Sequence, residues 1–565
     1  MRHIPRRSLL GLSPLALCSC GKSDPYFGKT GPPSKQALIY AIASEPSSLD
    51  PAGALGGTEF YVLPALFDGL VSTDPESLEP RAALATHYEV NASLTEFTFY
   101  LRGHANPRGT RLPRPGSTAE PASWSDGHPV LAQDFVFAWR RMVDPSAANA
   151  YASSFYPVAN AYEISQGKSR PESLGVQADG DFLLRVSLRR PAAHFLKLIG
   201  MPQFAPVPRH VVQGTGPSWA QPGRMVSSGP FLLHEWKPYE RIVLRRNPWY
   251  FDASRVRLEE IRFLPVSDGA TSVNLYKTGD AHAMHGRAVP PLWIPALRGR
   301  KDFQTTAALR SLFHAFNTTR PPFDNRLLRY ACHMATNKRE IVRWLDGGQT
   351  TASGVIPSFR GYQGIQSLPV VVGDGDYDVL SYNPAAARQL LVLAGVSKLA
   401  FDLTFPNRPK SKEIAQILQQ QWRNNLGAEV RLVMLEWNAW NQTALSFDYS
   451  GVIESGIGAE YADPNTFFEL FTGGYDGSGW SDSEFKRMVD AANATGDPAG
   501  RMARLANCEE RLLREMPVLP LLFDSHSYLQ KPYVHGMTPN ALDIPQFRTA
   551  WIDTNWSRAH DDTGN

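Results

Sequence analysis

The sequence predicts an α/β protein with mixed sheets and more than one domain. Near residue 400, a strand, a helix and a second strand follow one another at the spacing of a βαβ unit. Such units have parallel strands and a crossover that is almost always right-handed. The chain has 565 residues, whereas a domain usually holds roughly 100–200, so we expect two or three domains.

The first half of the chain alternates short strand and helix patterns. Residues 37–44 (ALIYAIAS) and 96–102 (EFTFYLR) alternate like strands, and residues 60–71 (FYVLPALFDGLV) have helical spacing. Residues 103–123 hold Pro, Gly, Arg and Ser without periodicity and predict an exposed loop. A turn, WSDG, then leads into a predicted helix at 132–144 (AQDFVFAWRRMVD).

The second half gives the βαβ unit itself. Residues 398–406 (KLAFDLTFP) and 428–437 (AEVRLVMLEW) have strand patterns. The segment between them, KSKEIAQILQQQWRNNLG, predicts a helix that ends at Gly427, because glycine is the usual residue just beyond a helix C-terminus. Residues 383–395 (NPAAARQLLVLAG) predict another helix, capped by Asn383.

The N-terminus has the features of an export signal. Arg2, Arg6 and Arg7 precede the short apolar run SLLGLSPLAL, and CSC follows. The apolar run is shorter than the roughly 20 residues that cross a bilayer, so residues 1–20 are predicted to be a lipoprotein signal peptide. Cys20 is the expected lipidated residue, because a small residue precedes it. The two adjacent arginines leave both the general and the twin-arginine export routes open.

Composition excludes several classes of function. The net charge is +3, which is too small to indicate a nucleic-acid partner. Cys332 and Cys508 are the cysteines outside the signal region, and two cysteines make no disulfide framework, so we expect buried free thiols. His282 and His285 have a spacing that suits a metal, but no third ligand accompanies them, and we expect no metal. No motif indicates a cofactor or a nucleophile with its base.

The stretch GIGAEYADPNTFFELF (456–471) places two acids after two glycines. Asp463 is expected to cap the helix that begins with Pro464. Glu460 then has no structural role, and the glycine-rich ESGIG before it suits a close approach of another backbone. A peptide brings both a backbone that can add as a strand and an α-ammonium group, whose pKa is roughly 7.7–8.0. The alternative is that Glu460 is a solvated loop acid.

Six stretches carry motifs, in order along the chain: EPSSLDP (45–51), LFDGLV (66–71), WSDGHPVLAQDFVFAWRRMVDPSAANAYAS (124–153), SSGPFLLHEWKPYERIVLRRNPWY (227–250), FNTTRPPFDNRLLRYACHMATNKREIV (316–342) and EYADPNTFFELFTGGYDGSGWSDSEFKRMV (460–489). Together they resemble the extracellular solute-binding proteins of family 5, in particular the oligopeptide-binding proteins of ABC importers. The resemblance covers nearly the whole mature chain.

The resemblance implies a three-domain, periplasmic-binding-protein-like (class II) fold with mixed sheets and a ligand cleft between domains. Domain I would be discontinuous, with residues 21–67, 205–307 and 521–565. Domain II would span residues 68–204 and domain III residues 308–520. Domains I and III would close on the ligand by a hinge motion.

The resemblance also implies which residues meet the ligand. The backbones that would pair with a peptide are those of Leu55, Gly56 and Gly57 and of Gly456, Ile457 and Gly458. Family aromatic residues line the cleft at the positions of Tyr151 and Trp437. Glu460 stands where the family usually has an aspartate that holds the peptide's α-ammonium, so its side chain is one methylene longer. Glu454 stands near a basic residue of some relatives, so the ligand's carboxylate would be bound elsewhere.

The function implied is that of a substrate-binding lipoprotein that delivers oligopeptides to the permease subunits of an ABC importer. We expect a monomer that is held to the membrane by its lipid on the periplasmic or extracytoplasmic side, with no enzymatic activity and no nucleic-acid partner. Three alternatives stay open. The same fold could bind a nickel chelate, a murein peptide or a sugar; Glu460 and Asp463 could form the carboxylate pair of a hydrolase; or the chain could be a surface receptor or chaperone.

Overall fold

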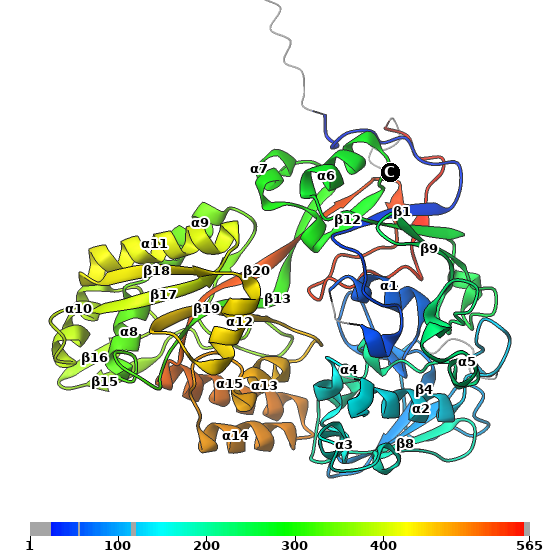
Figure 1. The fold of residues 1–565 in the computed structure, drawn as a ribbon, viewed down its shortest axis with the longest axis horizontal. Helices are drawn as coiled ribbons and strands as arrows, with labels where there is room; N and C mark the ends of the chain where they lie inside the picture. Colours follow the sequence, from blue (N-terminus) through cyan, green and yellow to red (C-terminus); the bar gives the residue numbers. More distant parts are fainter. Residues whose placement is uncertain (1–23, 55–56, 115–119, 148, 559–565) are drawn as a thin grey trace, which may run out of the picture.

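A computed structural model describes residues 24–54, 57–114, 120–147 and 149–558, and it shows two lobes side by side (Figure 1). The predicted signal peptide with Cys20 lies outside the described residues. Among the described helices, none is long and apolar enough to cross a bilayer.

The larger sheet has eleven strands and extends through both lobes. Its order is β18-β17-β19-β13-β20-β12-β1-β11-β10-β9, and β14 also pairs with β20. The strands are β1 (Ala37–Ile42), β9 (Phe231–Lys237), β10 (Arg241–Arg246), β11 (Glu260–Pro265), β12 (Ala283–His285), β13 (Phe303–Phe316), β14 (Thr350–Thr351), β17 (Ala400–Pro406), β18 (Glu429–Leu435), β19 (Gly451–Gly458) and β20 (Val518–Gln530).

Two long antiparallel strands, β13 and β20, connect the lobes. Their pairing is continuous from Phe303 to Ala307 and resumes at Ser311 after a shift of register. Such an irregularity interrupts the ladder and lets the strands bend. The break therefore lies where one lobe gives way to the other.

The second lobe contains a separate five-stranded sheet with the order β6-β4-β5-β8-β7. Its strands are β4 (Ala85–Val90), β5 (Glu96–Leu101), β6 (Thr110–Arg111), β7 (Val176–Ala178) and β8 (Leu183–Ser187). Three two-stranded sheets complete the strands: β2 (Val71–Thr73) with β3 (Pro80–Ala82), β15 (Pro369–Val372) with β16 (Gly375–Asp378), and β21 (Val534–His535) with β22 (Trp551–Ile552).

Helices cover the faces of these sheets (Figure 1). They are α1 (Glu59–Leu66), α2 (Ala132–Val143), α3 (Ala161–Ser165), α4 (Phe195–Leu198), α5 (Arg209–Thr215), α6 (Gly269–Thr278), α7 (Ile294–Leu297), α8 (Arg326–Met334), α9 (Lys338–Leu345), α10 (Pro384–Leu393), α11 (Pro409–Leu426), α12 (Trp437–Ser446), α13 (Asn465–Gly473), α14 (Ser483–Asn493) and α15 (Pro498–Glu515).

The βαβ prediction is confirmed. Strands β17 and β18 are parallel neighbours, and α11 connects them and ends at Gly427. This glycine has a φ of 68°, a left-handed conformation that glycine adopts without the steric cost of a Cβ atom. The side chain of Asn383 accepts the N–H of Ala386 at the start of α10, as predicted from the capping pattern.

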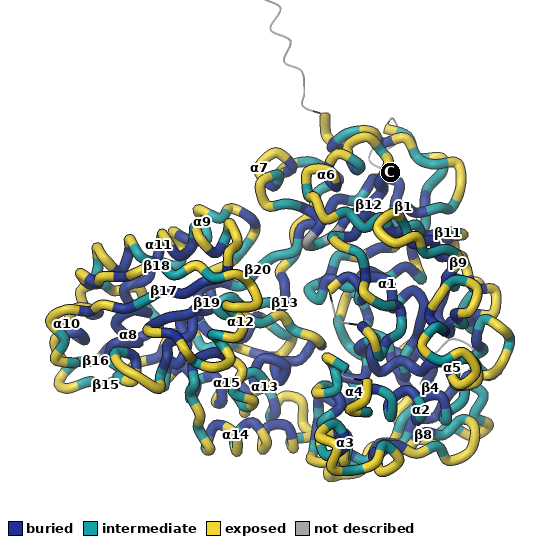
Figure 2. The backbone as a smooth tube through the Cα atoms, viewed as in Figure 1, coloured by how far each residue is buried: buried dark blue, intermediate teal, exposed yellow. Residues whose placement is uncertain are grey.

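The buried residues form separate cores rather than one (Figure 2). One large core fills the lobe that holds the five-stranded sheet and β9–β11. Two others lie in the opposite lobe, on either side of the sheet formed by β13 and β17–β19. Cys332 and Cys508 are buried free thiols in these two cores, as the sequence predicted. The limits of the three domains stay a prediction, although strands from all three segments assigned to domain I lie side by side.

Candidate ligand-binding cleft

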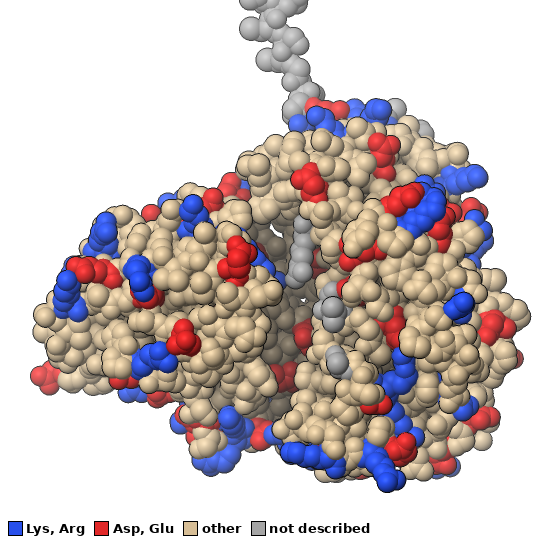
Figure 3. All heavy atoms as spheres, in the orientation of Figure 1, with Lys and Arg blue, Asp and Glu red and all other residues tan. Residues whose placement is uncertain are grey.

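A deep groove separates the two lobes (Figure 3). Strand β19 and the segment that follows it belong to one wall. The opposite lobe contributes the segments around α1 and α4. The groove is therefore the place where backbone and side chains of both lobes can meet one ligand.

Strand β19 has an edge that its neighbours leave unpaired. Strand β13 pairs with β19 along its length, from Val452 to Gly458. On the other side, β17 pairs with β19 only as far as Ile453. Within the described part of the chain, Ser455–Gly458 therefore has no strand on its second edge. Its N–H and C=O groups can pair with a strand that comes from outside.

The two glycines of this edge have different physical roles. A Cβ atom on Gly456 would lie 2.7 Å from the carbonyl oxygen of Ser311 in β13, so the absence of a side chain is required by the fold. A Cβ atom on Gly458 would meet only the Arg310 side chain, at 4.0 Å. The fold therefore does not require a glycine at position 458, whose surroundings are open on the side of the unpaired edge.

This difference gives a prediction with matched variants. Gly456→Ala is expected to lower the free energy of unfolding by about 1–3 kcal/mol, because the backbone of β13 at Ser311 must shift to make room for the new Cβ atom. Gly458→Ala is expected to leave the melting temperature unchanged and to weaken binding of extended ligands. Calorimetric melting and ligand titration of both variants measure the two effects. Equal destabilisation by the two substitutions would contradict the assignment.

Glu460 follows the free edge of β19. Among the described residues, none donates a hydrogen bond to its carboxylate or forms an ion pair with it; its backbone N–H contacts Thr466 Oγ1 at 3.5 Å. Glu460 is exposed to solvent, but the surrounding protein raises the pKa of its carboxyl group by removing part of its hydration. An unpaired carboxylate that has lost part of its hydration favours a cationic partner.

Asp463 has a different and stronger partner than expected. Its two oxygens accept from the two Nη atoms of Arg501, both at 2.7 Å, and both side chains are buried. Burial would raise the pKa of Asp463, but Arg501 holds it below its ordinary value. Asp463 also accepts the N–H of Asn465 at 3.0 Å, as a capping residue would. The helix prediction is corrected by one residue: α13 begins at Asn465, and Pro464 precedes it.

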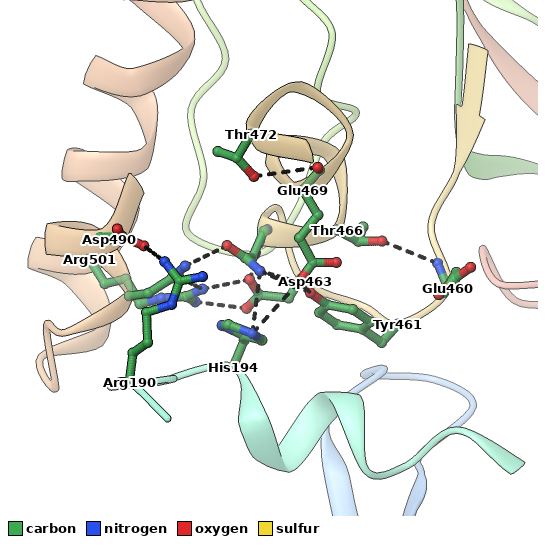
Figure 4. Close-up of polar contacts among 12 residues, drawn as sticks. Arg190, His194, Glu460, Tyr461, Asp463, Thr466, Glu469, Thr472, Asp490 and Arg501 are labelled. Atoms are coloured by element: carbon green, nitrogen blue, oxygen red, sulfur yellow. Dashed lines mark hydrogen bonds and ion pairs between the residues drawn. The ribbon is translucent and has the colours of Figure 1, made fainter. Parts of the chain in front are cut away.

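A polar cluster joins the two lobes beside this ion pair (Figure 4). His194, just before α4, stacks on Tyr461 of the opposite lobe with ring centroids 5.7 Å apart. Its Nε2 lies 3.3 Å from the side-chain nitrogen of Asn465. Ala193 donates its N–H to the carbonyl of Asn493 at 3.0 Å. These contacts hold the lobes together at a place away from β13 and β20, the two strands that connect the lobes.

Glu469 lies between this cluster and Glu460. Its Oε1 accepts from the Tyr461 hydroxyl at 2.9 Å and from the Asn465 amide at 2.8 Å. The walls of the groove raise the pKa of Glu469 to about 7, and the charge of Glu460 adds to the effect. Its side chain is still half exposed to water, so this shift does not translate into a stability of comparable size.

The raised pKa of Glu469 predicts a pH effect. The unfolded carboxyl group has a pKa of about 4.3, so between that pH and about 7 the folded protein keeps a proton that the unfolded chain has lost. The wild type therefore loses stability as pH rises through this window. The Glu469→Gln variant lacks this slope. Melting temperatures should be measured from pH 4.5 to 8. The difference between the melting temperature of the variant and that of the wild type should rise up to about pH 7 and then stay constant.

A second titratable group in the cluster changes stability in the opposite sense. Burial lowers the pKa of His194 to about 4, so this group favours the folded state as pH rises. His194 is present in both the wild type and the Glu469→Gln variant. Its contribution therefore cancels in the difference between their melting temperatures. Profiles that stay parallel across the whole range would contradict the role of Glu469.

Trp437 begins α12 and is 47% exposed. Its ring stacks on Trp440 at 4.6 Å, and the guanidinium of Arg408 lies 4.2 Å from the ring centre. Glu454, inside β19, is buried and accepts from Ser411 Oγ at 2.7 Å. Burial raises the pKa of Glu454. Where a ligand's carboxylate would be bound therefore stays a prediction.

The predicted residues of the opposite lobe are described in part. Tyr151 is half-buried and packs against Phe60 with ring centroids 5.6 Å apart. Gly57 has a φ of 70°, a conformation that suits glycine. Leu55 and Gly56 lie outside the described residues.

Sequence reasoning missed Arg501, His194 and Glu469. Glu469 had a usable signal, since it follows Asn465 by four residues and therefore shares its helix face. Arg501 lies 38 residues from its partner Asp463, and no local pattern connects them. His194 reaches the cluster only because the lobes meet there.

Comparison with known proteins identifies the family. The family model of bacterial extracellular solute-binding proteins, family 5 (middle region), matches residues 120–479, which is more than half of the chain. The chain belongs to this family. The family 5 protein is 29% identical over 566 residues to the dipeptide-binding protein DppE of Bacillus subtilis (strain 168), a match that covers 97% of this chain and 98% of DppE.

Solved structures agree with this membership. The periplasmic murein tripeptide-binding protein MppA, in its unliganded open form, has a TM-score of 0.76 and 28% identity, and the match covers 93% of this chain and 98% of MppA. Haemophilus influenzae OppA in complex with the peptide RPPGFSPFR has a TM-score of 0.72 and 26% identity, over 92% and 99% of the two chains. The prediction of a class II periplasmic-binding-protein fold is confirmed.

Proposed function

We propose that this family 5 protein is the substrate-binding component of an ABC peptide importer and binds oligopeptides in extended form between its lobes. One observation carries the proposal: the unpaired edge of β19 leads directly to Glu460, a carboxylate with no cation beside it among the described residues. An extended peptide with a free α-ammonium supplies the complement of both features. The complex of Haemophilus influenzae OppA with the peptide RPPGFSPFR supports a peptide as the ligand.

The geometry accounts for affinity without strict sequence preference. A peptide that adds as a strand along Ser455–Gly458 is bound through main-chain hydrogen bonds, which every peptide can make. Its side chains would alternate into a wide, wet groove, where water can mediate contacts with many side-chain types. Tyr151 and Trp437 would provide aromatic surfaces from the two lobes. The guanidinium of Arg408, above Trp437, is a candidate partner for the ligand's carboxylate.

Closure of the lobes would follow from the hinge strands. The break in register between β13 and β20 gives a place for bending, and a ligand that contacts both walls favours the closed arrangement. Permease subunits would then distinguish loaded from empty protein. The lipid anchor at Cys20, the monomeric state and a location on the extracytoplasmic side belong to the same proposal.

The hydrolase alternative finds less support. Asp463 is engaged by Arg501 on both oxygens, so it is not available as the second member of a carboxylate pair with Glu460. A non-enzymatic role agrees with membership in a solute-binding family. A different solute in the same groove is the main alternative. An anionic solute fits poorly, because Glu460 and Glu469 are close in the groove.

Native mass spectrometry of the purified protein tests the proposal. We expect a series of bound masses that correspond to heterogeneous peptides, which exchange for added peptides of known sequence. A single non-peptide mass would point to another solute. Protein that carries nothing and fails to bind any added peptide would contradict the proposal.

A further inference from the structure

A cluster of two histidines and one aspartate lies outside the groove. Asp126 and His128 belong to the turn after Trp124, and His210 is the second residue of α5. The ligand atoms of the three side chains lie within 4.8 Å of one another. Helix α5 lies at the outer side of its lobe, away from the opposite lobe (Figure 1). The cluster is therefore separate from the candidate ligand-binding cleft.

The three side chains converge on one point. Asp126 Oδ2 lies 2.7 Å from Nε2 of His210 and 3.3 Å from Nδ1 of His128. The two imidazole rings lie with their centroids 4.5 Å apart. A tetrahedral zinc ion with bonds of about 2.0–2.1 Å holds its ligand atoms roughly 3.4 Å apart, so small rotations of the side chains would admit the ion.

The backbone fixes the turn that carries Asp126 and His128. The turn is closed by hydrogen bonds from the Trp124 N–H to the His128 carbonyl (2.7 Å) and from the Gly127 N–H to the Trp124 carbonyl (2.9 Å). Gly127 has a φ of 89°, which this tight turn needs. Ser125 donates its N–H to the carbonyl of Ser227 at 2.9 Å, which ties the turn to the rest of the lobe. The backbone of the turn is thus already ordered before an ion binds.

An ion pair alone explains the arrangement less completely. The same carboxylate oxygen, Asp126 Oδ2, faces two imidazole nitrogens at once. A divalent cation bound by two neutral imidazoles and the carboxylate satisfies all three groups.

We propose that Asp126, His128 and His210 form a surface site for a zinc ion. Two imidazole nitrogens favour zinc and its borderline neighbours over calcium and magnesium, which prefer oxygen ligands. Three protein ligands leave the fourth tetrahedral position open to water or to a group from outside. The site lies on the outer surface, so its ion would be a surface-bound group rather than a solute in the groove, and the proposal is independent of the proposed function.

Isothermal titration of tag-free, EDTA-treated protein with ZnCl₂ tests this site. We expect one equivalent of zinc to bind, a rise in melting temperature with zinc, and no competition from a large excess of MgCl₂. His128→Ala and His210→Ala are each expected to weaken binding at least tenfold. His234→Ala, at an exposed histidine of β9, is the matched control and should bind zinc as the wild type does.

Zinc binding by the variants decides whether the ion lies at this site. Unchanged zinc binding by a His128→Ala/His210→Ala double variant would place the ion elsewhere and overturn the proposal, as would an absence of stoichiometric binding by the wild type. Circular dichroism shows whether each variant keeps its fold. If a histidine variant is misfolded, the Asp126→Asn variant, which preserves shape, takes its place: loss of zinc binding supports the site, and unchanged binding overturns it.

Discussion

Replacement of Arg501 by leucine is expected to lower the free energy of unfolding by about 3–5 kcal/mol. The change leaves the carboxylate of Asp463 buried without the two hydrogen bonds that Arg501 supplies. A buried charge that has lost its partner is among the most destabilising defects in a protein. The same carboxylate accepts the N–H of Asn465, the first residue of α13, and lies near His194, so the contact between the lobes should also loosen. Urea unfolding, with the midpoint and slope compared with the wild type, measures the effect.

A second ion pair gives the control. Arg487 and Glu484 form an exposed pair on α14, and Arg487→Leu is expected to change stability by no more than about 1 kcal/mol. The double variant Asp463→Leu/Arg501→Leu should be less destabilised than the sum of its two single variants, because it removes both charges together. Additive effects in this cycle would show that the pair contributes little and would contradict the prediction.

The parts of this structure that could be predicted are those that local patterns determine. The strand, helix and strand between residues 400 and 435 were predicted because alternation, amphipathic spacing and Gly427 act within a few residues of one another. Helix α10 was predicted from Asn383 for the same reason. The position of Glu460 after a glycine-rich strand was also visible in the sequence, since both features are adjacent along the chain.

The rest depends on contacts between distant segments. The free edge of β19 exists because β17 stops pairing with it at Ile453. The sequence of β19 does not determine where the pairing with β17 ends. The same holds for Gly456 and Gly458, which look alike in sequence but differ because Ser311 of β13 lies against only one of them. Arg501 and Asp463 were brought together by the fold of α13 and α15. Long-range contacts of this kind decide the details of a site, whereas local patterns decide its elements.

Replacement of Glu460 by glutamine is expected to weaken the binding of peptides with a free N-terminus by about 10- to 100-fold. The substitution keeps the shape of the side chain and removes its charge, so the ligand's ammonium loses a charge-assisted hydrogen bond worth roughly 1.5–3 kcal/mol, and 1.4 kcal/mol corresponds to a factor of ten in affinity. N-acetylated peptides carry no such charge, and their affinity should hardly change. Calorimetric titration of one peptide in both forms measures the difference.

Two further variants make the result specific to this position. Glu413→Gln removes the same charge from α11 and should leave both affinities unchanged. Glu460→Asp shortens the side chain by one methylene but keeps its charge, so it should keep the preference for the free amine, which a glutamine cannot. If Glu460→Gln weakened free and acetylated peptides equally, the carboxylate would act by shaping the wall of the groove. A ligand would then be bound along β19 by its backbone alone, with nothing to fix which end lies at residue 460.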